Sequence, residues 1–269
     1  SNNGITYTFN TDYQEVCEYY PPKKIDMAMN YNNNSLYKLI NTFLTNLHNN
    51  KLSIRFNYKR RIIVSLSGGP DSMVVLFLLC ILSKKHSINI EAFHINYKNR
   101  SESDIEEDMI KHYCEKLGIK LHIYTFKYLR RKKCDRELYE NLTRKVRFNI
   151  YKYLDAPVIL GHIKDDLIEN IWTNLSKGKE LFKLHKIEES SYIDEQPILR
   201  PFHRTEKKDI IQFAKEYNIP YLKNTTPDWS NRGKLRNNFI PEVNKQFGNI
   251  DNKLLYMSDS ISSYYTILD

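Results

Sequence analysis

The sequence lacks any uninterrupted run of about 18 apolar residues, the length that a helix needs to cross a lipid bilayer. Its first residues also lack the positively charged and then apolar pattern of a secretory signal. These two absences argue against a membrane-spanning or exported protein. We therefore expect a soluble cytoplasmic protein that works without a membrane partner.

Cysteine is scarce as well. The chain has 4 cysteines, Cys17, Cys80, Cys114 and Cys134, and no two of them form a C-x-x-C pair. Local spacing therefore predicts neither a zinc ribbon nor an iron–sulfur cluster. A disulfide framework is typical of small secreted domains, so it is not expected in a chain of 269 residues.

The composition is that of a folded, basic protein. Hydrophobic residues make up 41% of the chain, but 20 Tyr and 12 Phe provide large side chains for a packed core, which argues against general disorder. The formal net charge is +9. This excess suits a polyanionic partner such as RNA, although a solvated, lysine-rich surface would produce the same number.

The first part of the chain differs in character from the rest. Residues 1–34 contain Asn runs and the pair Pro21-Pro22, which predicts a loosely ordered arm or an irregular wrap on the domain. Behind Ser35, apolar residues recur at helical spacing, so we expect an amphipathic helix over about 36–48. We expect three parts: an arm and helix in 1–58, a nucleotide-binding domain in 59–225, and a short helical, RNA-contacting extension in 226–269.

A glycine-containing turn stands between an apolar strand and an apolar helix. The strand is expected at Arg61–Leu66 and the helix at Met73–Leu82, and the turn consists of Ser67, Gly68, Gly69, Pro70, Asp71 and Ser72. Glycines allow a sharp turn and a close approach to a ligand, and the positive end of the helix attracts phosphate. The turn lacks the lysine of the G-x-x-x-x-G-K-[ST] loop, so ordinary γ-phosphate cleavage is not expected.

Asp71 in that turn would repel a bare phosphate, which makes sense if Mg²⁺ lies between them. A plain strand-to-helix turn capped by an Asp is the structural alternative.

Strand-like and helix-like segments then alternate. Strands are expected at 88–94, 120–126 and 158–161. Helices are expected at 103–117, at 136–154, and after the last of these strands through Leu175; the first of them is opened by a capping box from Ser103 to Glu106 and closed by Gly118. Such alternation is typical of an α/β fold. We expect a doubly wound parallel sheet of about five strands with helices on both faces and a ligand site at the carboxyl ends of the strands.

Two more strand ends carry polar side chains. His94 and Asn96 close the second strand, with Arg100 just beyond, where a base or ribose could lie; an ordinary loop histidine is the alternative. Gly161, His162, Asp165 and Asp166 follow the fourth strand, with Glu169 one turn further. Asp166 and Glu169 are three residues apart, so both carboxylates face the same side of a helix. A helix-capping role for Asp165 is the alternative, but capping does not require three acids and a histidine at one strand end.

These motifs, in this order, resemble those of a known family. Ser67–Ser72 is similar to the signature of the PP-loop ATP pyrophosphatases, which cleave ATP between its α and β phosphates and activate a base by adenylation. Within that superfamily the chain resembles tRNA(Ile)-lysidine synthetase from about Arg60 to Pro241. The segments that carry the resemblance are Ser67–Ser72, His94–Arg100, Glu140–Phe148, Gly161–Glu169, Pro197–Pro201, Asp228–Asn231 and Leu235–Asn237.

The resemblance implies a ligase that adenylates the wobble cytidine of a tRNA with ATP and then joins free lysine to it. It implies that the catalytic residues are Asp71, Asp165, Asp166 and Glu169, and that Mg²⁺ is held by Asp71 and Asp165. It implies that ATP is bound by Ser67, Gly68, Gly69, Pro70, Asp71, Ser72, His94, Asn96, Gly161 and His162. It implies that RNA is contacted by Arg100, Arg144, Arg147, Arg200, Arg236 and Asn237.

Two other readings stay open: a thiolation enzyme of the same superfamily, which typically relies on paired cysteines, and a non-catalytic nucleotide- or RNA-binding protein. The sequence does not separate a monomer from an oligomer.

Overall fold

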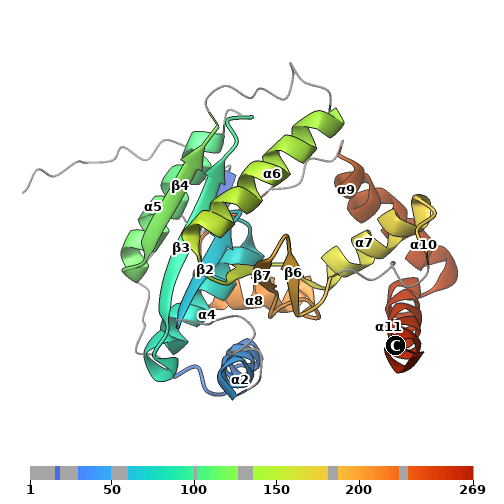
Figure 1. Cartoon of the computed structure of the whole chain (residues 1–269), viewed down its shortest axis with the longest axis horizontal. Helices are drawn as coiled ribbons and strands as arrows, with labels where there is room; N and C mark the ends of the chain where they lie inside the picture. The colour runs from blue at the N-terminus through green and yellow to red at the C-terminus, as the bar shows by residue number, and fades with distance from the viewer. Residues whose placement is uncertain are drawn as a thin grey trace, which may run out of the picture.

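A central sheet with helices on both of its faces forms the body of the molecule (Figure 1). The computed structural model describes residues 16–18, 30–49, 60–99, 102–126, 136–180, 187–223 and 230–268. Arg100, one of the residues expected to contact RNA, lies outside these ranges. Among the described residues, no helix combines the length and apolar character needed to cross a membrane.

The sheet has six strands in the order β4-β3-β2-β5-β7-β6. Their bounds are β2 Arg61–Leu66, β3 Asn89–Asn96, β4 Lys120–Thr125, β5 Val158–Leu160, β6 Ser190–Ile193 and β7 Gln196–Leu199. All neighbouring pairs are parallel except β6 with β7. The predicted parallel sheet of about five strands is thus confirmed, with an antiparallel strand added at one edge.

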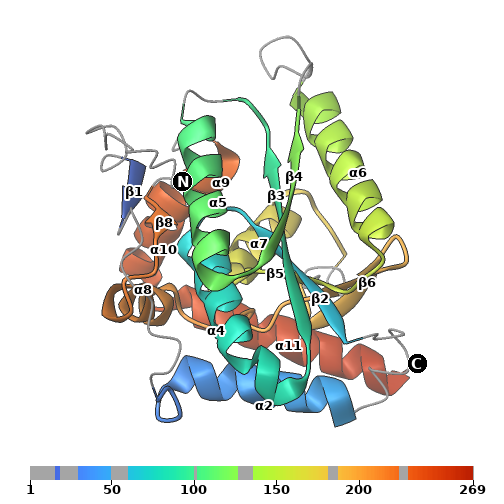
Figure 2. The same cartoon turned by 90° about the vertical axis from the view of Figure 1, so that its left-hand side faces the viewer.

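Helices cover the two faces unequally. The helices are α2 Ser35–Asn49, α4 Pro70–His86, α5 Ser103–Leu117, α6 Arg136–Leu154, α7 Lys164–Ser176 and α8 Lys207–Glu216. Alternate residues of β2 belong to different cores: Ile62 and Val64 pack with α2, α4, α5 and α8, whereas Ile63 packs with α6. This two-sided burial explains why the strand reads as a continuous apolar run. Figure 2 shows α2, α4 and α5 on one side of the sheet and α6 on the other.

The expected capping box at the start of α5 is wrong. The helix begins at Ser103, but its N-cap residue is Glu102, and no side chain there makes a capping hydrogen bond. Ser103 is already helical and 5% exposed, so its hydroxyl stands inside the first turn instead of before it. The other end is as expected, because Gly118 adopts a left-handed conformation with φ of 66°.

The N-terminal segment contacts the domain where it is described. Tyr31 is 3% exposed and lies against the rings of Phe77 and Tyr217, with centroid distances of 5.7 and 5.0 Å. Strand β1, Cys17–Glu18, pairs antiparallel with β8, Tyr221–Leu222. Leu222 in turn donates a backbone hydrogen bond of 2.9 Å to the carbonyl of Gly68. The early residues therefore support the back of the glycine turn.

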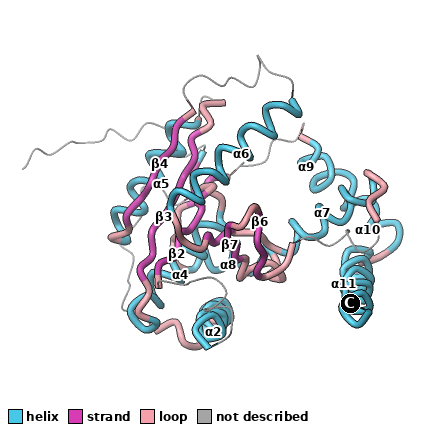
Figure 3. The backbone as a smooth tube through the Cα atoms, viewed as in Figure 1, coloured by secondary structure: helices cyan, strands magenta, loops and turns pink. Residues whose placement is uncertain are grey.

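The last elements that the structure describes are helical, and Figure 3 draws them in cyan. They are α9 Asn231–Lys234, a π-helical turn η3 Leu235–Phe239, α10 Ile240–Phe247 and α11 Ile250–Leu268. Leu255 of α11 packs on Ile168 and Ile171 of α7. Phe239 of η3 meets Trp172 of α7 edge to face at a centroid distance of 4.9 Å. These contacts hold the last segment against the helix that follows β5.

A cluster of charged groups around the buried Glu91 lies at the opposite end of the sheet from the glycine turn. Glu91 of β3 accepts hydrogen bonds from Arg61 at 2.8 and 2.9 Å and from His122 at 2.5 Å. The Arg61 guanidinium is the main cause that lowers the pKa of Glu91 to about 2. Because this folded-state pKa lies below the unfolded value, the cluster stabilises the fold above about pH 4.5. That contribution is lost as the pH falls towards 2.

We expect Glu91→Gln to lower the free energy of unfolding at pH 7 by roughly 2–3 kcal/mol, because it leaves a partly buried guanidinium with a weaker partner. The variant should also lose stability less steeply on acidification between about pH 4.5 and 2. Urea titrations at several pH values measure both effects. Glu115→Gln, on an exposed position of α5, is the matched control. Equal acid sensitivity of Glu91→Gln and the unchanged protein would contradict this account of the cluster.

Candidate active site

A cavity of about 730 Å³ opens at the carboxyl ends of the parallel strands. Its walls come from the ends of β2, β3 and β5, from Arg200 after β7, and from one side of α6. Parallel strands direct their carboxyl ends to one edge, which is why loops far apart in the sequence meet here. The cavity therefore lies where a ligand site was expected, at the carboxyl ends of the parallel strands.

The glycine turn meets the cavity at the start of α4 through Ser67, Asp71 and Ser72, whereas Gly68, Gly69 and Pro70 are not among the lining residues. Gly68 has φ of 79°, and a Cβ atom there would lie 2.4 Å from the side chain of Leu222. The Ser72 hydroxyl donates to the Gly69 carbonyl at 3.1 Å and accepts from the Ser67 backbone N–H at 3.2 Å. These bonds hold the turn in shape at the positive end of the helix, an arrangement suited to binding phosphate.

Gly161, at the end of β5, supports the same turn from the side. A Cβ atom on Gly161 would lie 2.7 Å from the backbone nitrogen of Ser72, closer than such atoms approach. The clash would be with backbone, so a flexible side chain cannot relieve it.

We expect Gly161→Ala to displace the first turn of α4 and to weaken nucleotide binding by at least about tenfold, because phosphate contacts depend on backbone position. Equilibrium dialysis with labelled ATP measures the effect. Gly178→Ala is the control, since a Cβ atom at Gly178 would meet nothing within 4 Å, although its φ of 61° makes some loss of stability expected. Unchanged ATP affinity in folded Gly161→Ala would contradict the proposed role of the turn.

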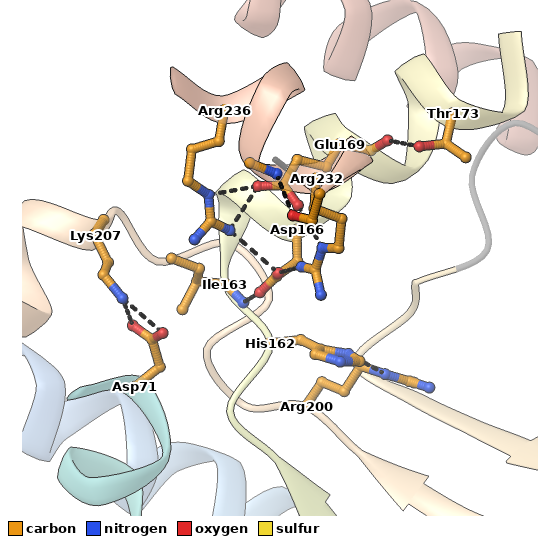
Figure 4. A network of polar contacts seen from close by, with 12 residues as sticks. Asp71, His162, Ile163, Asp166, Glu169, Thr173, Arg200, Lys207, Arg232 and Arg236 are labelled. Carbon is orange, nitrogen blue, oxygen red and sulfur yellow. Dashed lines mark hydrogen bonds and ion pairs between the residues drawn. The ribbon is translucent and has the colours of Figure 1, made fainter. Parts of the chain in front are cut away.

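Asp71 is paired with a lysine from a distant helix. Both of its carboxylate oxygens lie within hydrogen-bond distance of Lys207 Nζ, at 2.8 and 2.7 Å (Figure 4). Lys207 is the first residue of α8. Burial raises the pKa of Asp71, and the charge of Lys207 opposes that shift. The glycine turn lacks a lysine of its own, and α8 brings one to the acid of that turn.

A second polar network joins α7 to the last segment of the chain (Figure 4). Arg232 Nε donates to Glu169 Oε2 at 2.8 Å, and Arg232 also contacts Asp166. Arg236 Nε donates to Glu169 Oε1 at 2.6 Å, and Arg236 Nη2 lies 3.6 Å from Asp166 Oδ1. The two carboxylates face the same side of α7, as expected from their spacing. Asp166 also accepts from the Ile163 backbone N–H at 2.9 Å.

His162 and Arg200 form a third contact on the cavity wall. Arg200 Nε donates to His162 Nδ1 at 3.2 Å, and Arg200 Nη1 donates to the Glu188 carbonyl at 2.9 Å and to Ser191 Oγ at 2.8 Å. Burial lowers the pKa of His162 to about 4 and that of Arg200 to about 10. His162 is therefore neutral near pH 7, with its proton on Nε2 because Nδ1 accepts a bond.

Arg200 is only 3% exposed and lines the cavity, and the three hydrogen-bond acceptors named above are all neutral. A buried positive charge of this kind favours an anionic ligand. The position of Arg200 suits a ligand inside the cavity better than RNA on the outer surface. The expected RNA contact of Arg200 stays a prediction, and it concerns only a part of the RNA that enters the cavity.

His94 and Asn96 lie at the end of β3 and line the cavity. His94 Nδ1 donates to the Leu66 carbonyl at 2.9 Å, and burial lowers the pKa of His94. Nε2 of the neutral ring is thereby left as the acceptor nitrogen. The Asn96 amide donates to Glu107 at 2.7 Å and its oxygen accepts from the Lys98 N–H at 2.9 Å. Asn96 thus orders the turn before α5, and its role in ATP binding stays a prediction.

The remaining basic residues are partly gathered at the cavity. Arg144 and Arg147 of α6 line it and lie over the ring of Phe148, with centroid distances of 5.0 and 5.8 Å. Asn237 is exposed on η3. Five arginines line the cavity: Arg144, Arg147, Arg200, Arg232 and Arg236. Such a concentration of guanidinium groups suits a ligand that carries several phosphates.

Magnesium was expected at Asp71 and Asp165. Both acids feel the charge of Lys207, and burial raises the pKa of each. Within the described ranges, no three His, Cys, Asp or Glu side chains come together as a ready-made metal site. Mg²⁺ commonly uses one or two carboxylates together with substrate phosphates and water. Asp71 lines the cavity, where a nucleotide could supply further ligands, whereas Asp165 is not among the lining residues. The magnesium site at this pair therefore stays a prediction.

Comparison with known proteins agrees with these features. A family model described as a PP-loop domain matches residues 36–243. A tRNA(Ile)-lysidine synthase from Streptococcus sanguinis is 27% identical over 223 residues, which are 79% of this chain and 48% of that protein. One from Prochlorococcus marinus is 26% identical over 214 residues, or 76% of this chain and 65% of that protein. The chain spans about half to two thirds of the length of these curated relatives.

A solved structure shares the fold. The U34-tRNA thiolase NcsA from Methanococcus maripaludis, with its 4Fe-4S cluster, superposes with a TM-score of 0.61 over 86% of this chain and 78% of that one. The sequence identity is 17%, so the likeness concerns the fold alone.

Proposed function

The chain belongs to the PP-loop domain family, and we propose that it is an ATP-dependent carbon–nitrogen ligase that acts on tRNA, of the tRNA(Ile)-lysidine synthetase type. In the first step, the O2 atom of the wobble cytidine attacks the α-phosphorus of ATP, and pyrophosphate leaves. In the second step, the ε-amine of free lysine attacks C2 of the activated base, and AMP leaves.

One observation supports this proposal more than any other: Asp71 of the glycine turn and Asp166 of the acid pair line a single cavity. A phosphate site and a cation site in one cavity allow both half-reactions to occur at one base. The second step requires that geometry, because the amine must reach the base while AMP is still attached to it.

For the adenylation step, the glycine turn binds the phosphates at the positive end of α4. Arg200 and the arginines of α6 neutralise the charge that develops on the leaving pyrophosphate. Asp71 and Asp165 would hold Mg²⁺, which offsets phosphate charge when it is bound. Lys207 keeps the Asp71 carboxylate in place at 2.7–2.8 Å until the nucleotide arrives.

For the second step, the lysine amine must lose a proton, because an ammonium group with a pKa near about 10.4 has no free electron pair. Asp166 and Glu169 bind the ammonium, and one of them accepts its proton as the nitrogen attacks. The same two carboxylates would therefore select the substrate and activate it.

Thiolation by the same fold is less well supported. The three described cysteines, Cys17, Cys80 and Cys114, are all buried, and none of them lines the cavity. Burial raises the pKa of Cys80 above its usual range, and the thiolate is the reactive form of cysteine. Cys134 lies outside the described residues. A purely binding protein would have no need of acids buried beside a phosphate site, where they cost stability.

The proposal predicts that pyrophosphate release requires a tRNA with a cytidine at the wobble position. Release is measured with a coupled phosphate assay on in vitro transcripts that carry cytidine or uridine at that position. We expect stimulation by the cytidine transcript alone. Equal release with both transcripts would contradict adenylation of the wobble base.

A further inference from the structure

The acid pair, Asp166 and Glu169, is proposed to bind the substrate amine, but both carboxylates already form ion pairs with arginines of the chain itself. Arg232 and Arg236 together contact both Asp166 and Glu169. The side chain of Glu169 is 3% exposed and that of Asp166 is 11% exposed. A free amine approaching from solvent therefore meets carboxylates that are covered and electrostatically satisfied.

The two arginines differ in how deeply they lie. The Arg232 side chain is 56% exposed, whereas that of Arg236 is 30% exposed. Arg232 thus forms the outer cover and has solvent on one side into which it can withdraw. An ion pair with one half-exposed partner is only modestly stable, so a stronger anion can compete for it.

The segment that carries these arginines is short and irregular. Arg232 lies in the four-residue helix α9, and Arg236 lies in the π-helical turn η3. Single π-turns are often found at functional sites, where a regular ladder is interrupted. The segment rests on α7 through the edge-to-face contact between Phe239 and Trp172. Arg232 and Arg236 of this segment contact the acid pair and also line the cavity.

We propose that Arg232, assisted by Arg236, is a specificity-determining residue that closes the amine site of the free protein and opens it when a polyanionic substrate enters the cavity. This inference rests on the proposed function. Guanidinium groups bind phosphate through two parallel hydrogen bonds, so the phosphates of RNA and nucleotide compete well with carboxylates. As Arg232 moves to phosphate, Asp166 and Glu169 lose a positive partner and gain affinity for an ammonium group.

In this exchange of ion pairs, the guanidinium and the two carboxylates each keep a partner of opposite charge. Phosphate takes the guanidinium, and the ammonium of the amine takes its place on the carboxylates. An amine is therefore admitted after the base that it must attack, and free lysine or another cation does not occupy the site beforehand.

Lysine binding in the absence of RNA tests the proposal. We expect weak binding to the unchanged protein, and at least roughly tenfold tighter binding to Arg232→Gln, which removes a charged competitor from the acid pair. Arg232→Lys keeps a cation and should bind lysine as weakly as the unchanged protein. The matched control is Arg204→Gln, which breaks an arginine–carboxylate pair with Asp259 outside the cavity. Isothermal titration calorimetry measures all four proteins.

Fluorescence of Trp172 gives a second readout that does not depend on lysine. The chain has 2 tryptophans, so Trp229→Phe leaves Trp172 as the sole indole. We expect its emission to change when a cytidine-bearing tRNA is added with a nonhydrolysable ATP analogue, because the Phe239 contact shifts with the segment. An emission that stays constant at saturating tRNA would overturn the proposal.

The outcomes separate this inference from the proposed function. If lysine binds the unchanged protein without RNA, and Arg232→Gln binds it no more tightly, the closure by Arg232 is wrong while the ligase proposal stands. If no protein binds lysine with or without tRNA, the ligase proposal fails, and the proposed role of Arg232 fails with it.

Discussion

Asp71→Asn is expected to reduce pyrophosphate release by about a thousandfold or more, because it removes a carboxylate that would hold the Mg²⁺ needed to offset phosphate charge. The carboxylate lies in the glycine turn and is held by Lys207 through both oxygens. Asparagine preserves the size of the side chain and one acceptor, so the fold should survive. Rates are measured with saturating tRNA and ATP, and circular dichroism confirms that the variant is folded.

Asp209→Asn is the matched control for this experiment. Asp209 stands in the first turn of α8, as Asp71 stands in the first turn of α4, but it is exposed and does not line the cavity. The control should keep full activity. Pyrophosphate release by Asp71→Asn near the unchanged rate would show that the turn does not perform adenylation.

Glu169→Gln is expected to separate the two half-reactions. Removing its charge weakens a charge-assisted contact to the lysine ammonium, a loss of roughly 1.5–3 kcal/mol or about ten- to hundredfold in lysine use. ATP binding should change little, because Glu169 is not among the residues that line the cavity and does not contact the glycine turn. Lysine-dependent AMP formation and ATP affinity are measured side by side.

The structure adds a consequence for stability. Glu169 is 2% exposed and accepts bonds from Arg232 and Arg236, so Glu169→Gln leaves two guanidinium groups with one carboxylate between them. A lower melting temperature is therefore expected alongside the kinetic loss. Glu115→Gln on α5 controls for the chemistry of the substitution. If Glu169→Gln used lysine as well as the unchanged protein, the acid pair would not be the amine site.

The strands and helices around the glycine turn could be predicted because their apolar patterns are strong. Strand β2 and helix α6 have the expected bounds, Arg61–Leu66 and Arg136–Leu154. Strands β1, β6, β7 and β8 could not be predicted, since segments of two to four residues are too short to establish a period. Helix α4 begins at Pro70, before its first apolar residue, because proline suits the first turn of a helix.

The same limit applies to the site. The acids could be predicted because each follows a strand and the ends of parallel strands converge. Their partners could not, because Lys207 is 136 residues from Asp71, and Arg232 is 63 residues from Glu169. Contacts of such separation leave no local pattern. The burial of Arg200 was also unforeseen, since a charged residue is normally exposed and its depth depends on the edge strand β6.

The most direct test of the central claim is nucleoside analysis of the RNA product. The protein is incubated with ATP, Mg²⁺, isotopically labelled lysine and a tRNA transcript that carries cytidine at the wobble position, and the digested RNA is analysed by mass spectrometry. The proposal predicts a cytidine derivative that has gained labelled lysine, formed in equal amount to AMP. Unmodified cytidine, or a nucleoside that has gained sulfur when a sulfur donor is supplied, would contradict it.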